Sequence, residues 1–179
     1  AIADLANRRT TSEGAAQARR EAAERLGVDP EAPTLLVTGG SLGALHVNES
    51  MTGGADALPE GAQVVHLTGR GKDEPVRAAV EAAGLSDRWH VIDYLRTMED
   101  ALAVADLVVC RSGAGTVAEM EALGLPCIYV PLPIGNGEQR LNAADHVAAG
   151  GAQLVDDKDF TADFVRRNVF PLLGSTRLA

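Results

Sequence analysis

The stretch LVVCRSGAGTVAEMEALGLPCIYV (residues 107–130) contains, in order, an apolar run, a loop of small residues, a helical pattern and a second apolar run. Both runs are short, aliphatic and almost continuous, which is typical of parallel strands buried on both faces. Gly124 stands where the helix between them needs a C-terminal cap. The stretch therefore predicts a strand, a helix and a second strand that runs parallel to the first.

The same alternation extends over the rest of the chain. Strands are expected at residues 34–38, 63–67, 90–94, 107–110, 127–130 and 152–155. Helices are expected at residues 43–57, 73–83, 97–104, 115–124, 138–149 and 161–173, and a leading amphipathic helix should end at Gly27. Gly84 and Gly150 stand at helix ends in the same way as Gly124. The order predicts one doubly wound, Rossmann-like α/β domain with a six-stranded parallel sheet.

Composition narrows the function classes. The chain has 179 residues, 46 % of them hydrophobic and only 3 % aromatic, so an aliphatic core is expected. A net charge of −9 argues against nucleic-acid binding, which needs a basic surface. No apolar run approaches the roughly 18 residues of a membrane span, and the expected location is the cytoplasm. Cys110 and Cys127 end and begin apolar runs, as inert buried thiols do. No metal or cofactor is expected.

The unusual loops all follow predicted strands at their carboxyl ends, where doubly wound sheets bind ligands. These loops are GGSLGA (39–44), GRGKDE (69–74), LRTM (95–98), RSGAGT (111–116) and PLPIGNGEQ (131–139). Several cations fall on the same edge and would favour a nucleoside diphosphate there: Arg70, Lys72, Arg96, Arg111 and Arg140. The four histidines show no carboxylate at a useful spacing, so no catalytic role is assigned to them.

The RSGAGT loop is suited to phosphate, because small residues expose backbone N–H groups at the positive end of a helix. The Thr116 hydroxyl would add a donor, and Glu119 could accept hydrogen bonds from ribose hydroxyls. A tight strand–helix turn, with Glu119 as a carboxylate that favours the helix dipole, is the alternative. GGSLGA is not a GxGxxG fingerprint and indicates either close approach to a ligand or helix–sheet packing.

The loop after residue 130 is long and leads to Glu138, Gln139 and Asn142. A carboxylate and two amides can distinguish donor from acceptor hydroxyls on a sugar. Helix capping by Asn136, with Glu138 in the first turn, is the alternative and explains fewer residues of this loop.

GGSLGA, CRSGAGTVAE and PLPIGNGEQRLNA, in this order, resemble the MurG family, the N-acetylglucosaminyltransferases that make lipid II from lipid I and UDP-N-acetylglucosamine (UDP-GlcNAc). The resemblance extends from about Ala1 to Leu173. It implies the C-terminal, donor-binding half of a two-domain GT-B glycosyltransferase. Residues 1–179 would form that domain, with a leading helix and linker at 1–30, and the N-terminal acceptor domain would be absent.

The resemblance also implies roles for individual residues. Leu95 would read uracil through its backbone, beside Tyr94, and Glu119 would bind the ribose. The other implied contacts are Ser41 near the nucleotide, Ala114, Gly115 and Thr116 at the diphosphate, and Glu138, Gln139, Asn142 and Met98 at the sugar. Leu42 and Glu138 stand where many relatives have glutamine. No catalytic or metal-binding residue is expected in this half.

The implied partners are UDP-GlcNAc, lipid I and the acceptor domain, and the full protein would be peripheral on the cytoplasmic face of the cell membrane. The chain alone would then be inactive. One alternative is a stand-alone UDP-sugar-binding module or a subunit that pairs with a separate acceptor domain. A UDP-sugar epimerase of the same architecture is less well supported, since its acidic and histidine residues have no obvious counterparts.

Overall fold

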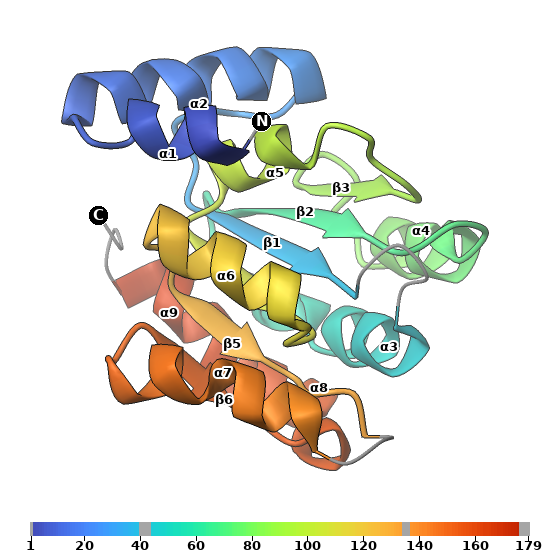
Figure 1. Cartoon of the computed structure of the whole chain (residues 1–179). Coiled ribbons are helices and arrows are strands. Elements are labelled where there is room, and N and C mark those ends of the chain that lie inside the picture. The colour runs from blue at the N-terminus through green and yellow to red at the C-terminus, as the bar shows by residue number, and fades with distance from the viewer. Residues whose placement is uncertain (1, 40–43, 134–136, 176–179) are drawn as a thin grey trace.

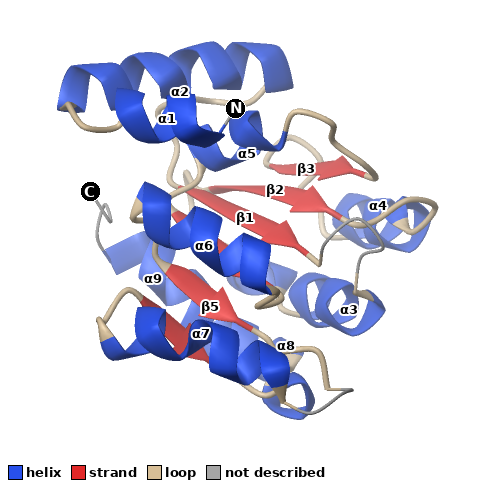
Figure 2. Cartoon of the chain, viewed as in Figure 1, coloured by secondary structure: helices blue, strands red, loops and turns tan. Residues whose placement is uncertain are grey.

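The computed structural model describes residues 2–39, 44–133 and 137–175. Within these residues six parallel strands form one sheet in the order β3-β2-β1-β4-β5-β6 (Figures 1 and 2). Their bounds are β1 (Thr34–Thr38), β2 (Gln63–Leu67), β3 (Trp89–Ile92), β4 (Leu107–Cys110), β5 (Cys127–Tyr129) and β6 (Ala152–Leu154). The predicted doubly wound fold is confirmed, and the change of direction in strand order lies between β1 and β4.

Helices cover both faces of this sheet (Figure 2). The α-helices are α1 (Ile2–Arg8), α2 (Ser12–Leu26), α3 (Leu45–Gly53), α4 (Asp73–Ala82), α5 (Met98–Val104), α6 (Ala114–Leu123), α7 (Glu138–Ala148), α8 (Ala162–Phe164) and α9 (Phe170–Ser175). Two short 3-10 helices, η1 (Ala55–Ala57) and η2 (Asp157–Asp159), and the π-helix η3 (Val165–Val169) complete the described elements.

The core has two parts because successive strand residues point to opposite faces. Leu36 and Val65 pack with α1, α2, α5 and α6 on one face. Leu35, Val37 and Val64 pack with α3, α4 and the C-terminal helices on the other. The four inner strands, β1, β2, β4 and β5, are thus buried on both faces, as their continuous apolar runs indicated, whereas the edge strands β3 and β6 are partly exposed.

Helix ends follow the glycine positions. Gly27, Gly84, Gly124 and Gly150 all adopt positive φ angles, between 65° and 83°, and this confirms their predicted role as helix stops. Thr11 accepts a hydrogen bond from the Gly14 N–H and caps the leading helix α2. The additional helix α1 before it was not predicted.

One predicted helix was wrong in its continuity. The segment expected as one helix at 43–57 is α3 followed by η1, and the break falls where the C-terminal segment approaches closely. A Cβ at Gly54 would lie 2.8 Å from a Val165 methyl and 2.9 Å from the Ala162 carbonyl oxygen. The segment expected as a helix at 161–173 is helical from Ala162 to Ser175, with the π-helix η3 between α8 and α9.

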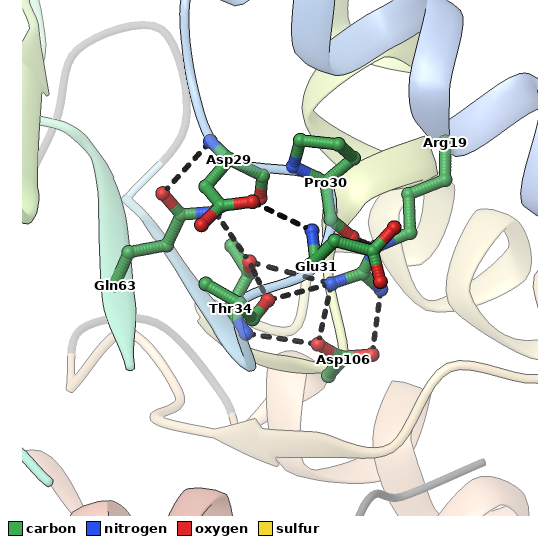
Figure 3. A network of polar contacts seen from close by, with 8 residues as sticks. Arg19, Asp29, Pro30, Glu31, Thr34, Gln63 and Asp106 are labelled. Carbon is green, nitrogen blue, oxygen red and sulfur yellow. Dashed lines mark hydrogen bonds and ion pairs between the residues drawn. The ribbon is translucent and has the colours of Figure 1, made fainter. Parts of the chain in front are cut away.

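A polar network closes the amino edge of the sheet (Figure 3). Arg19 of α2 donates to both carboxylate oxygens of Asp106, at 2.7 and 2.9 Å, and to the carbonyl oxygens of Pro30 and Ala32. Asp106 in turn accepts from the Thr34 N–H at the start of β1. The polar groups at this edge therefore attach the leading helix to the sheet. Among the described residues, no helix has both the length and the apolarity needed to cross a bilayer.

Candidate functional site

A cavity of about 520 Å³ opens at the carboxyl edge of the sheet. Residues at or just after the ends of β1, β2, β3, β4 and β5 line it, so described parts of several segments that the sequence singled out meet in one place. The cavity wall includes five of the predicted site residues: Leu95, Met98, Thr116, Glu119 and Gln139. This is the edge at which doubly wound sheets bind ligands.

The loop after β4 presents the first turn of α6 without a side-chain cap. Gly113 is the N-cap residue, with φ of −62°, and no side chain accepts a hydrogen bond there. A Cβ at Gly113 or at Gly115 would meet nothing within 4 Å. Neither backbone strain nor crowding therefore explains these two glycines, whereas close approach of a ligand to the backbone would. The arrangement can receive an anion at the positive end of the helix.

The remaining predicted residues lie around this cavity rather than in its wall. Ala114 and Gly115 are exposed on the first turn of α6, and Glu138 is exposed at the start of α7. Asn142 is half-buried one turn further along α7. Ser41, like Leu42, lies outside the described residues.

Gln139 and Asn142 make hydrogen bonds within the protein. The Gln139 side-chain oxygen accepts from the Leu132 N–H at 2.6 Å and from the Ser112 N–H at 3.3 Å. The Asn142 Nδ2 donates to the Ser112 carbonyl oxygen at 3.1 Å. In this structure both amides therefore connect α7 to the neighbouring loops.

Two of the cations at this edge of the sheet have carboxylate partners. Arg111, which lines the cavity, lies 2.7 Å from Asp157, and Arg140 pairs with Asp156. These partners, from the segment after β6, balance the positive charge of the two arginines. Arg70 stacks over the Tyr94 ring at 3.9 Å, next to the cavity that Tyr94 lines.

His66, His90 and His146 contact polar side chains within the fold. His66 is fully buried and accepts at Nδ1 from the Trp89 indole N–H at 3.1 Å, while its Nε2 faces the Asn48 side-chain oxygen at 2.9 Å. Burial lowers the pKa of His66 to about 3. His146 contacts the Tyr129 hydroxyl. These contacts support the sequence-based view that the histidines are structural.

The cysteines are also structural. Both thiols are free and buried. A hydrogen bond with Cys127, together with burial, raises the pKa of the Cys110 thiol well above its usual value, which disfavours a reactive thiolate. In the part of the chain that the structure describes, no group of three or more histidine, cysteine or acidic side chains could hold a metal ion.

Sequence reasoning missed several residues of the cavity wall. Asp93 was assigned to a strand, although β3 ends at Ile92 and Asp93 lines the cavity. Thr38, Met120 and Leu132 also line it. The position of Asp93 directly after β3 could have indicated that it lines the cavity. The sequence pattern gave no such indication for Met120, which lines the cavity from the interior of a helix.

Strand order, two helical layers and a cavity at the carboxyl edge define the class of Rossmann-like α/β domains. Within this class the comparison with known families is specific, because the Glycosyltransferase family 28 C-terminal domain matches residues 34–173. The chain belongs to this family.

Known proteins similar to the chain agree with this assignment. The chain is 50 % identical over 188 aligned residues to the UDP-N-acetylglucosamine--N-acetylmuramyl-(pentapeptide) pyrophosphoryl-undecaprenol N-acetylglucosamine transferase of Bifidobacterium longum, covering 97 % of the chain and 47 % of that protein. A Streptomyces coelicolor protein of the same name is 48 % identical over 89 % of the chain and 43 % of its own length. The chain thus spans less than half the length of these relatives.

Solved structures show the same fold. The crystal structure of Acinetobacter baumannii MurG superposes with a TM-score of 0.71 at 26 % identity, over 87 % of the chain and 45 % of that protein. The UDP-GlcNAc 2-epimerase from Neisseria meningitidis superposes with a TM-score of 0.54 at 16 % identity, over 89 % of the chain and 42 % of that protein. The second similarity shows a shared fold alone.

Proposed function

We propose that the chain is the donor-binding half of an inverting glycosyltransferase that transfers N-acetylglucosamine from UDP-GlcNAc to lipid I, giving lipid II. The observation that carries this proposal is the uncapped start of α6, with Gly113 and Gly115 open to the surroundings beside the cavity. Relatives about 50 % identical are named as N-acetylglucosamine transferases, which supports the choice of sugar.

The donor would extend across the cavity from β3 to α7. Uracil would contact the backbone at Leu95, and the ribose hydroxyls would donate to Glu119. The N–H groups of Ala114, Gly115 and Thr116 would donate to the diphosphate. The sugar would face Glu138, Gln139 and Asn142, near Met98, and Ser41 would lie close to the nucleotide.

This placement supplies part of the chemistry. Negative charge develops on the departing UDP as the acceptor hydroxyl attacks the anomeric carbon. The backbone N–H groups at the start of α6 would stabilise this charge without reorganisation. The helix dipole of α6 adds to the effect. Positioning of the acceptor, and any general base, would come from the N-terminal half of the longer protein.

The acceptor also suggests where the full protein works. The relatives' name describes a pyrophosphoryl-undecaprenol acceptor, and a polyprenol chain remains in a membrane. We therefore infer that the full protein is peripheral on the cytoplasmic face of the cell membrane, with the donor domain facing the cytoplasm.

A transfer assay tests the proposal. Radiolabelled UDP-GlcNAc and a lipid I analogue are added to the isolated chain, and then to the chain mixed with an N-terminal half from a close relative. Binding without turnover by the chain alone, and turnover only with both halves, is the expected result, since in-line positioning supplies a large share of rate enhancement. Turnover by the isolated chain would place catalytic groups within these residues and contradict the division of labour.

A further inference from the structure

Ser112, directly after β4, is connected to α7 through all of its polar groups. Its side chain is completely buried. Its N–H donates to the Gln139 side-chain oxygen at 3.3 Å, and its hydroxyl donates to the Gln139 carbonyl oxygen at 2.8 Å. Its own carbonyl oxygen accepts from the Asn142 Nδ2 at 3.1 Å. The chain just before α6 is therefore held by the first turns of α7.

Gln139 extends this connection to a third segment. The same side-chain oxygen accepts from the Leu132 N–H at 2.6 Å. Two backbone N–H groups donate to this atom. Of the two ends of an amide side chain, only the oxygen can accept hydrogen bonds from them. One atom thus joins the loops after β4 and β5 beside the cavity that Gln139 lines.

The next residue after Ser112 makes the connection important for the site. Gly113 is the N-cap of α6, and no side chain caps this helix. The direction of the first N–H groups of α6 therefore depends on how the preceding backbone is held. Buried, satisfied hydrogen bonds fix such geometry, because breaking one leaves an unpaired buried group.

We propose that Ser112, Gln139 and Asn142 form a clamp, hereafter the α6–α7 clamp, that positions the first turn of α6 to receive the donor's diphosphate. The proposal rests on the function proposed above only for the identity of the ligand. Ser112 and Asn142 are positioning residues in this account and act through the backbone of α6. The clamp also links the start of α7 to the start of α6, so the diphosphate and the sugar of the donor would be bound by elements that share one support.

Positioning residues and residues that contact only the sugar should differ in their effects on ligand binding. A residue that contacts only the sugar should affect UDP-GlcNAc binding and leave UDP binding unchanged. A residue that positions the diphosphate turn should weaken both ligands by the same factor. Asn142 distinguishes the two, since the family resemblance implies a sugar contact and the structure shows its Nδ2 bonded to Ser112.

The experiment uses Asn142→Leu and Ser112→Ala, with Ser50→Ala as the matched control. Ser50 is also a buried serine, and its hydroxyl donates to the Phe160 carbonyl oxygen at 2.8 Å. The Ser50→Ala substitution removes the same kind of hydrogen bond at a residue that does not line the cavity. Dissociation constants for UDP and for UDP-GlcNAc are measured by calorimetry, and amide hydrogen exchange is measured on the ligand-free proteins.

We expect Asn142→Leu and Ser112→Ala each to weaken both ligands by about tenfold, the effect of losing one such hydrogen bond. Exchange at the Val117 amide, whose hydrogen bond to the Gly113 carbonyl oxygen closes the first turn of α6, should rise in both variants and remain unchanged in Ser50→Ala. Selective loss of UDP-GlcNAc binding in Asn142→Leu, with unaltered exchange, would overturn the clamp. The clamp would also be overturned if Ser50→Ala weakened UDP binding as much as Asn142→Leu and Ser112→Ala do. Failure of the wild-type chain to bind either ligand would instead refute the proposed function, while the exchange data would still decide on the clamp.

Discussion

The Arg111 guanidinium group lies 2.7 Å from the Asp157 carboxylate, and the two side chains are only 14 % and 18 % exposed. The same nitrogen of Arg111 also donates to the carbonyl oxygens of Val130 and Pro131. One cation thus joins the ends of β4 and β5 to the segment after β6. Its charge is already balanced, so Arg111 stabilises the loops around the cavity rather than serving as a free counter-ion for phosphate.

Asp157→Asn should therefore lower the free energy of unfolding by about 1.5–3 kcal/mol, the usual contribution of a charged hydrogen bond with low exposure. Asp159→Asn, two residues away and exposed, is the control and should change it little. Urea denaturation of both variants gives the comparison. Equal stability of Asp157→Asn and the wild type would show that the ion pair contributes nothing.

His66 should make the folded chain sensitive to acid. Its pKa is about 3 in the folded state against an ordinary 6.5, so the unfolded chain takes up the proton first as the pH falls. Stability is then complete above about pH 6.5 and decreases below it. Between about pH 7.5 and about pH 5.5, protonation of this single group in the unfolded chain should lower the free energy of unfolding by about 1.4 kcal/mol.

The measurement compares the wild type with His66→Gln, whose other titrating groups are the same. The wild type should lose about 1.4 kcal/mol more than the variant over that interval. Parallel loss in the two proteins would mean that His66 takes up a proton in the folded state near its ordinary pKa.

Gly115→Ala should separate stability from binding. The residue lies in the first turn of α6 and a Cβ there meets no atom within 4 Å. Alanine in a helix is favoured over glycine by up to about 1 kcal/mol, so the melting temperature should stay equal or rise. UDP binding should weaken, because the methyl group would occupy space that the diphosphate needs. Unchanged affinity for UDP would show that UDP binding does not require a glycine at this position.

The sequence allowed the sheet to be predicted well because its signals are local. Continuous apolar runs marked the buried parallel strands, and glycines marked the helix ends. The error at β3 has a physical cause: Ile92 pairs with Leu67, the last residue of β2, so Asp93 and Tyr94 have no strand partner and line the cavity instead.

Features that depend on distant contacts could not be predicted. The pairing of Arg111 with Asp157 joins residues 46 positions apart. The sequence around each residue does not distinguish its side chain from an exposed one. The Ser112 contacts with α7 are of the same kind. Gly54 likewise fits a helical pattern in the sequence, and only the structure shows that the C-terminal segment packs against it. The loops were identified from sequence, whereas the interactions that hold them required the structure.

Glu119→Ala should weaken UDP binding by about 1–3 kcal/mol, the range for lost charged hydrogen bonds, with little change in melting temperature. Glu121→Ala is the matched control, since Glu121 lies on the same helix, is exposed and is not part of the cavity wall. Calorimetry with UDP distinguishes the two variants. A sharp fall in melting temperature with unaltered affinity would indicate that Glu119 is only a helix-stabilising carboxylate.

Binding of the donor at the carboxyl edge of the sheet can be followed residue by residue through backbone amide resonances during a titration. UDP-GlcNAc is added to the isotope-labelled chain, and each backbone N–H reports its own surroundings. We expect saturable shifts that are largest at Leu95, Ala114, Gly115 and Thr116, with little change around Arg19 and Asp106 at the opposite edge. Shifts concentrated at that opposite edge, or none at millimolar ligand, would contradict binding of the donor at the carboxyl edge.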